Sequence, residues 1–411
     1  MREHRPTWLI VVAAGVFVVS GCGGGKGAVS TTIAATSTTT AVPADAGTWS
    51  LIPDGPNPLS PPMAWTGTDL LVAEGSCCAS LGSVNLSAYD PSSGVWHTLP
   101  ATPLTPRNYA LGTWTGTEMI VAGGLASADG LTTDAVPVTD GAALDAATNT
   151  WHSIAPMPTT LLMTNPTAVW TGREVLVWAS FPDTNGREVV LAYNPSTNTW
   201  RSLPPSGLTP RAHAIAVWSG KELVVWGGSN LDSGVPYGDG ARLDPTTDTW
   251  RRLPPAPVPA RSMSAAVWSG HEVLLWGGDR GAGGQVGQGA AYNPTTNTWR
   301  ALPLSPSRAK SDPAGVWTGR VFLVIGGATS GDFPPPGPSA AAYDPTTNSW
   351  TALPAAPPYP AGPTSNAKFS AAEREGGMAV WTGKAVLLVG GGDHVQQGPL
   401  ANGVQWTPAG P

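Results

Sequence analysis

The chain has 411 residues, of which 41% are hydrophobic and 12% charged, so it holds enough apolar side chains to bury a large core. Its formal net charge is -6 and its Lys and Arg residues are scattered, which argues against nucleic acid as a partner. The 51 Gly and 43 Pro residues are well above average use and predict many turns.

The first 22 residues have the pattern of a targeting signal. Arg2 and Arg5 precede a continuous apolar run over residues 8–19, which is too short to span a bilayer. The run leads into Val-Ser-Gly-Cys at residues 19–22, which resembles the bacterial lipobox. The resemblance implies that residues 1–21 are a lipoprotein signal peptide and that Cys22 is lipidated. The lipid would anchor the chain to the cell membrane outside the cytoplasm, at the bacterial cell surface or in the periplasm. The alternative is an ordinary secretory peptide with a chance cysteine.

Residues 22–46 hold the lipidated cysteine followed by Gly, Ser, Thr, Ala and Pro with few core-forming side chains. Such a segment cannot bury enough apolar surface to fold, so we expect a disordered tether. The folded domain is therefore predicted to span residues 47–411.

Tryptophans repeat throughout this domain in two series. One opens a Trp-[Thr/Ser]-Gly triplet, and the other follows a polar turn. The members of the first series are Trp65, Trp114, Trp170, Trp218, Trp268, Trp317 and Trp381, and those of the second are Trp49, Trp96, Trp151, Trp200, Trp250, Trp299 and Trp350. A period of about 50 residues with four short strands per unit is typical of a propeller blade. The pattern resembles the kelch repeat, as in the central domain of galactose oxidase, and implies an all-β, seven-bladed β-propeller.

One unit shows the expected strands. Residues 262–268 predict the innermost strand, residues 272–278 the second, residues 289–292 the third and residues 299–303 the outer strand. The Gly of the triplet recurs in all seven units, and the position of Asn297 holds only Asn, Asp or Gly elsewhere. Both substitution patterns predict left-handed backbone at these turns.

The two ends of the domain complete one another. Residues 404–408 align with a third strand and no outer strand follows them, whereas residues 48–53 read as an outer strand without a blade. Pairing the two closes the last blade with one strand from the N-terminus and three from the C-terminus. The alternative is two independent β domains.

Alternating strand direction places short, repetitive turns on one face and the variable loops, including residues 125–140 and 355–372, on the other. Variable loops on a rigid scaffold are the usual layout of a binding surface, so we expect the ligand there. The predicted ligand-binding residues are those that open an innermost strand or follow a second one: Arg107, Arg211, His213, Arg261, Asp279, Arg280, Arg308, Asp393 and His394.

Two interpretations of these residues remain open. As a cluster, cations and carboxylates could hold an anionic peptide, a carboxylate or a sugar. Alternatively, each arginine, which kelch domains often place at the channel mouth, pairs with backbone or a neighbouring blade. The sequence favours a binding module for an envelope protein or a glycan, with a carbohydrate-active enzyme as the alternative.

Catalytic patterns are weaker. A galactose-oxidase-like copper site needs two histidines and two tyrosines, but His97 and His152 follow outer-strand tryptophans, so we expect no cofactor and no metal. A sialate-epimerase-like kelch enzyme would need only acid and base side chains in the channel, so that alternative stays open. The adjacent Cys77 and Cys78 could form a strained vicinal disulfide, remain thiols or link to another chain.

Overall fold

The computed structural model describes residues 47–56, 62–73, 84–127, 135–161, 166–180, 188–230, 232–329, 338–358, 370–392, 400 and 402–409. Contacts divide the chain into Met1–Ala41 and Val42–Pro411, and all described residues belong to the second unit. In this described part, no helix has the length and apolar character needed to cross a membrane.

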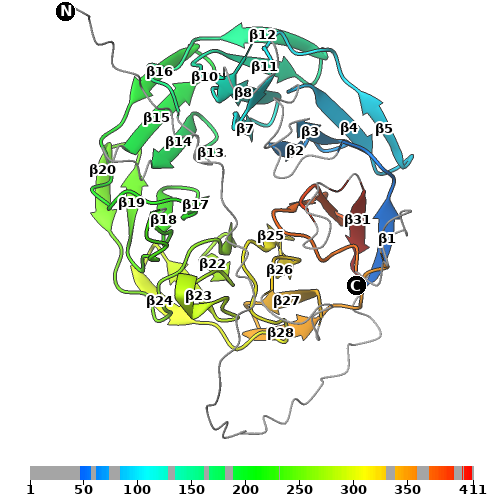
Figure 1. Cartoon of the computed structure of the whole chain (residues 1–411), viewed down its shortest axis with the longest axis vertical. Coiled ribbons are helices and arrows are strands. Elements are labelled where there is room, and N and C mark those ends of the chain that lie inside the picture. The colour runs from blue at the N-terminus through cyan, green and yellow to red at the C-terminus, as the bar shows by residue number, and fades with distance from the viewer. Residues whose placement is uncertain are drawn as a thin grey trace, which may run out of the picture. The chain divides into compact units, whose positions relative to one another are not determined.

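The strands form seven four-stranded antiparallel sheets, which we call blades 1 to 7 (Figure 1). The innermost strands, in blade order, are β2 (Met63–Trp65), β7 (Leu111–Trp114), β13 (Thr167–Trp170), β17 (Ile215–Trp218), β21 (Ala265–Trp268), β25 (Ala314–Trp317) and β29 (Met378–Trp381). The second strands are β3 (Leu70–Ala73), β8 (Glu118–Ala122), β14 (Val175–Ser180), β18 (Leu223–Trp226), β22 (Val273–Trp276), β26 (Phe322–Ile325) and β30 (Val386–Val389).

The third strands are β4 (Leu86–Asp90), β11 (Gly141–Asp145), β15 (Glu188–Asn194), β19 (Gly240–Asp244), β23 (Gly289–Asn293), β27 (Ala340–Asp344) and β31 (Gly403–Thr407). The outer strands are β5 (Val95–Thr98), β12 (Thr150–Ile154), β16 (Thr199–Ser202), β20 (Thr249–Arg252), β24 (Thr298–Ala301), β28 (Ser349–Ala352) and, in blade 7, β1 (Thr48–Ile52). A small extra sheet joins β6 (Arg107–Asn108), β9 (Leu125–Ala126) and β10 (Val136–Pro137), and η2 (Gly281–Gly283) is a 3-10 turn.

The blades pack against one another around a common axis. Each innermost strand contacts the innermost strands of the two neighbouring blades, and β29 of blade 7 contacts β2 of blade 1. Seven apolar clusters fill the spaces between neighbouring sheets, one for each pair of blades. Because second and third strands are covered on both sides, they read as continuous apolar runs rather than alternating ones.

Hydrogen bonds from the outer tryptophans join each blade to the one before it. Each indole Nε1 donates to a backbone carbonyl just after the preceding outer strand, at 2.7–3.1 Å. Trp49 donates to Pro354 O of blade 6 at 2.9 Å, and Trp96 donates to Pro53 O at 3.0 Å. The N-terminal strand therefore takes part in these tryptophan hydrogen bonds in the same way as every other outer strand.

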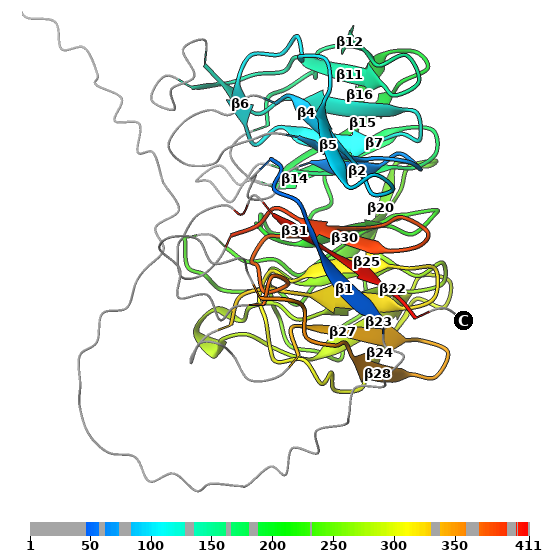
Figure 2. The ribbon, with the colours of Figure 1, turned by 90° about the vertical axis from the view of Figure 1, so that its right-hand side faces the viewer.

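The predicted pairing of the two ends is present. Strand β1 runs antiparallel to β31, with Thr48 opposite Thr407 and Ile52 opposite Gly403, and the two lie side by side in Figure 2. The Ile52 side chain is 2% exposed and packs with residues of blades 1 and 7, Leu70 and Leu387 among them.

The predicted left-handed turn positions are confirmed. The triplet glycines have φ between 81° and 107°, and Asn297 and its counterparts have φ between 50° and 71°. The inner strands are shorter than predicted: β21 begins at Ala265 rather than at residue 262, because Met263 itself has a φ of 54°. Strand β22 ends at Trp276 because Gly277 and Gly278 have φ of 74° and 110°.

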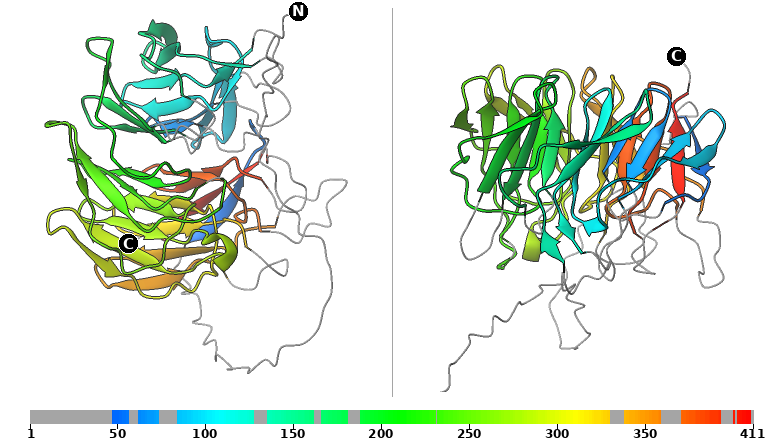
Figure 3. Two further views of the ribbon diagram at one scale, coloured as in Figure 1. Left: turned by 60° about the vertical axis from the view of Figure 1, so that its left-hand side comes forward. Right: turned by 90° about the horizontal axis from the view of Figure 1, so that it is seen from above.

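The strands run between two faces of the unit (Figure 3). We call the face with the Trp-[Thr/Ser]-Gly and Pro-Thr-Thr turns the turn face, and the opposite face, with the longer connections, the loop face. Each innermost strand starts at the loop face and ends with its tryptophan at the turn face.

Candidate functional site

Five buried cations stand at corresponding places on the loop face, each four residues before an innermost strand. They are Arg107, Arg211, Arg261, Lys310 and Arg374, and each is at most 2% exposed. A buried charge is stable only when it is paired or hydrogen-bonded, so the partners of these side chains decide what they can do.

Arg261 shows the arrangement. Its Nε donates to Pro259 O at 3.0 Å, and its Nη1 donates to Gly277 O at 3.1 Å and to Gln288 O at 2.8 Å. The side chain thus ties the end of the second strand to the start of the third. Burial lowers the pKa of Arg261 to about 10, and the charge of Arg280 acts in the same direction.

The other three arginines repeat this bridge, whereas Lys310 reaches only the start of the third strand. The backbone acceptors are Gly123 and Asp140 for Arg107, Gly227 and Asp239 for Arg211, Gly390 and Asn402 for Arg374, and Ser339 for Lys310. Arg107 and Arg211 also reach the carboxylates of Asp140 and Asp239, at 2.9 and 2.8 Å. The Nη2 atoms of Arg211 and Arg261 are buried with no hydrogen-bond partner among the described residues.

The double glycines that follow the second strands, such as Gly277 and Gly278, lie in the same set of contacts. Gly278 N donates to Lys310 O of the next blade at 2.7 Å, and a Cβ on Gly277 would lie 2.8 Å from that oxygen. Only glycine therefore allows the two backbones to approach. Blade 3, which has Ala179 and Ser180 at this point, instead continues β14 to Ser180.

These contacts place the predicted arginines inside the protein. Arg107, Arg211 and Arg261 lie at corresponding places on the loop face, each in its own blade, but their guanidinium groups hold loops and present almost no surface. Arg308 does not belong to the set. It is exposed, and Lys310 takes the position before β25, because the register is set by the distance to the strand and not by residue type.

A second set of residues lies two positions after the cations, and we call it the axial ring: Tyr109, His213, Met263, Asp312 and Gly376. All have left-handed backbone, with φ from 51° to 66°. Met263 N donates to His213 O at 3.0 Å, Asp312 N to Met263 O at 2.9 Å and Gly376 N to Asp312 O at 3.4 Å. These backbone hydrogen bonds therefore link blade 4 to blade 7 through blades 5 and 6.

The axial ring presents side chains with unused polar groups. His213, Asp312 and Tyr109 make no side-chain hydrogen bond within the part of the chain that the structure describes, and Tyr109 is 38% exposed. Water reaches the His213 imidazole, but the surrounding protein solvates its charged form poorly and lowers its pKa. Burial, with a smaller contribution from the charge of Glu375, raises the pKa of Asp312 to about 6.

The remaining predicted residues have different fates. The Asp279 carboxylate accepts a hydrogen bond from Gly281 N at 2.6 Å, and its backbone forms a β-bridge with Ser262. Arg280 beside it is exposed. Cys22, Asp393 and His394 lie outside the described residues, as do Cys77 and Cys78.

Three of the third-strand tyrosines and one outer-strand histidine take part in structural contacts. Tyr193, Tyr292 and Tyr343 each donate to the asparagine of the following turn at 2.7–2.9 Å, and His152 lies 2.7 Å from Glu118. Among the described residues, no group of three or more His, Cys, Asp or Glu could hold a metal ion.

Lys310, Arg374 and most of the axial ring were not predicted from the sequence. The signal was available: each of the five cations stands seven residues before an inner-strand tryptophan, and each ring residue stands five before it. Measuring from the tryptophan would have found Lys310 in place of Arg308, and Tyr109, Met263 and Asp312 beside His213.

The pKa of Asp312 predicts how stability depends on pH. An acid whose pKa is about 6 when folded and 3.8 when unfolded binds more protons in the folded state. Its stabilising contribution is full below about pH 4 and is lost as the pH rises through about 6. We therefore expect Asp312→Asn to stabilise the protein at pH 7.5, by at most about 3 kcal/mol, and to have little effect near pH 4.

Urea unfolding of both proteins at the two pH values checks this prediction, with the exposed Asp54→Asn as control. An Asp312→Asn effect of equal size at both pH values would contradict it.

Comparisons with known proteins agree with this geometry. At 18% identity, a solved structure described as "Structure of YjhT" covers 74% of this chain and 99% of its own, with a TM-score of 0.54. A fungal alcohol oxidase of the AA5 family, solved in complex with copper, covers 88% of this chain and 76% of its own at 14% identity, with a TM-score of 0.61. At these identities the likeness concerns the fold.

No curated protein matches the sequence. A family model described as the KLHDC2/KLHL20/DRC7 Kelch-repeats domain matches residues 165–391, which is more than half of the chain. The chain therefore belongs to the kelch-repeat family of β-propellers.

Proposed function

We propose that the protein is a binding module and that its ligand site is the axial ring on the loop face. The observation that carries this proposal is that His213, Asp312 and Tyr109 make no side-chain hydrogen bond among the described residues, while backbone hydrogen bonds hold His213 and Asp312 in place. Rigid placement lowers the entropy lost on binding, because the side chains need little reordering.

The exposed chemistry favours a ligand that donates hydrogen bonds. The cations before the inner strands are occupied inside the protein, so an anionic ligand would find few partners among them. Asp312 and the His213 imidazole can accept hydrogen bonds from hydroxyl groups, and Tyr109 offers an aromatic ring. We therefore propose a hydroxyl-rich ligand, a glycan, for this site.

Binding to a glycan array tests the proposal. We expect wild-type protein to bind a subset of neutral glycans and the Tyr109→Ala/Asp312→Asn variant to bind them at least about tenfold more weakly. Lys384→Gln, on the turn face, is the matched control and should bind like wild type. Retained binding in the double variant would place the site elsewhere.

Catalysis on a sugar is the second candidate, favoured by the pKa of Asp312 near 6. A carboxyl group that titrates close to neutral pH can serve as proton donor or acceptor. Incubation with each bound glycan, followed by proton NMR, should reveal a product if this is the function. If the glycans are unchanged, catalysis is excluded for them and binding is the only function that remains.

We further propose that a lipid on Cys22 holds the protein at the outer surface of a bacterial cell membrane. Support comes from the lipobox-like residues 19–22 after the short apolar run. Cys22→Ala should lose all incorporation of a fatty-acid probe, whereas Cys77→Ala/Cys78→Ala should keep it. Equal labelling of wild type and Cys22→Ala would disprove the anchor.

A further inference from the structure

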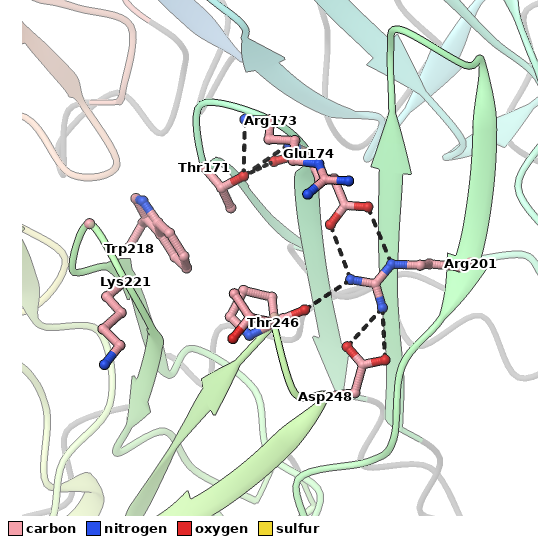
Figure 4. A pocket seen from close by; sticks show the side chains of 10 residues that line it. Thr171, Arg173, Glu174, Arg201, Trp218, Lys221, Thr246 and Asp248 are labelled. Atoms are coloured by element: carbon pink, nitrogen blue, oxygen red, sulfur yellow. Dashed lines mark hydrogen bonds and ion pairs between the residues drawn. The ribbon is translucent and has the colours of Figure 1, made fainter.

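A cavity of about 560 Å³ opens between blades 3 and 4 at the turn face, which is the face opposite the axial ring (Figure 4). Its lining includes Arg173 and Glu174 from the turn into β14, Trp218 and Lys221 from the corresponding turn of blade 4, and Arg201 and Asp248. It lies between turns of neighbouring blades, so both blades supply functional groups.

Arg201 forms ion pairs with both carboxylates in this lining. Its Nε and Nη2 donate to Glu174 at 3.3 and 3.0 Å, and its Nη1 donates to both oxygens of Asp248 at 2.8 and 3.0 Å. Glu174 belongs to blade 3 and Asp248 to blade 4, so the forked Arg201 guanidinium also fixes the blade 3 and blade 4 sides of the cavity relative to each other. Bidentate pairs of this kind are geometrically specific.

Two cations in the lining are left without an ion pair. The guanidinium of Arg173 and the ammonium of Lys221 are exposed and make no side-chain hydrogen bond or ion pair within the described ranges. Lys221 helps to lower the pKa of Asp244 through its charge, but the Asp244 carboxylate accepts its hydrogen bonds from Thr246. Three cations and two carboxylates line the cavity, which leaves a net charge of +1 in a chain whose net charge is -6.

Trp218 gives the cavity a flat, half-buried wall. Its ring packs on the apolar cluster between blades 3 and 4, and its Nε1 has no partner among the described residues. Figure 4 shows the ring between Arg173 and Lys221, beside the open space. An indole in this setting offers both a stacking surface and a hydrogen-bond donor.

We propose that this turn-face pocket binds a small hydroxylated organic anion, whose carboxylate or phosphate group is attracted by the charges of Arg173 and Lys221 and whose ring lies on Trp218. The charges select the anion, because charge-assisted hydrogen bonds are stronger than neutral ones. This site is separate from the axial ring, and the proposal does not depend on the function proposed there.

The matched control comes from the repeat itself. Arg320 and Lys384 hold the same turn position in blades 6 and 7, where Arg320 Nε lies 3.6 Å from Asp344. Thr351 replaces Arg201 in blade 6, so the fork that shapes the pocket is missing there. Replacing this pair by glutamine removes the same two charges from the same face without touching the pocket.

Calorimetric titration of the full-length protein in detergent micelles tests the proposal with glucuronate, glucose 6-phosphate and glucose as probes. We expect at least one of the two anions to bind, and glucose to bind at least about tenfold more weakly. Arg173→Gln/Lys221→Gln should weaken anion binding about tenfold or more, and added salt should weaken it further. Arg320→Gln/Lys384→Gln should leave binding unchanged, and thermal unfolding should confirm that both variants are folded.

Several results would overturn the proposal. One is that neither anion binds. Another is that both double variants lose affinity equally, because this would indicate unspecific attraction to surface charge. If binding survives Arg173→Gln/Lys221→Gln and is lost in Tyr109→Ala/Asp312→Asn, the anion occupies the axial ring instead. That last result would leave the binding function of the axial ring standing.

Discussion

Deletion of residues 1–53 is expected to abolish stable folding, although it removes only one short strand from the described domain. The deletion takes away β1, exposes the edge of β31 and empties the space that Ile52 fills between blades 7 and 1. It also removes the Trp49 bond to blade 6 and the carbonyl that accepts from Trp96. Truncation of one buried isoleucine costs about 2–5 kcal/mol, so with the lost strand pairing and tryptophan bonds the combined loss is comparable to the stability of an ordinary domain.

Deletion of residues 1–46 is the control, because it leaves β1 and both tryptophan bonds in place. Size-exclusion chromatography and thermal unfolding of the two truncated proteins provide the measurement, and we expect aggregation of the shorter one through its bare strand edge. A protein lacking residues 1–53 that is monomeric and melts within a degree or two of the control would show that blade 7 does not need its outer strand.

Arg261→Ala is expected to destabilise the protein by about 3–5 kcal/mol, a large effect for a single substitution. The arginine is 0% exposed, and its removal leaves a cavity and takes a charged donor from the carbonyls of Pro259, Gly277 and Gln288. Gly277 O keeps the Ser264 hydroxyl as a donor, and Gln288 O keeps the Gly277 amide. The loss of charge-assisted hydrogen bonds and the cavity left by a buried side chain both destabilise the folded state. Chemical denaturation with a two-state analysis measures the change in free energy of unfolding.

Two further variants separate the bridging role from charge alone. Arg308→Ala removes an exposed arginine from the same face and should change stability by less than about 0.5 kcal/mol. Arg261→Lys should lose less than Arg261→Ala, because blade 6 already uses Lys310 in this position. Equal losses for Arg261→Ala and Arg308→Ala would refute the structural role assigned to the buried set.

Local signals predicted the repeat well. The turn glycines and the position of Asn297 require left-handed backbone, and such a requirement is visible in the substitutions that a repeat tolerates. Residues 48–53 could be recognised as an orphan outer strand because the repeat supplied six complete examples to compare it with. Strand ends were less accurate, since Met263 carries a left-handed conformation that its residue type does not suggest.

The candidate site was harder to predict, because charge in a sequence does not tell where a side chain points. Arg261 and Arg308 look alike as residues, yet one is fully buried and the other exposed. The bridge from Arg261 to Gly277 and Gln288 exists because the double glycine turns the backbone carbonyl toward the arginine. Side-chain hydrogen bonds of this kind depend on a geometry that only the packed blade provides.

The period, the turns, the strand order and the pairing of the two ends could all be derived from the amino-acid sequence, because they depend on local backbone preferences and on residues repeated in each blade. Which polar groups are free depends instead on how the blades pack. Asp312 stays unpartnered at the axis, in the part of the chain that is described, while Glu174 and Asp248 are held by Arg201. Arg201 reaches Glu174 within its own blade, 27 positions away, and Asp248 in the neighbouring blade, 47 positions away. No local preference encodes such contacts, because they form only when neighbouring blades pack.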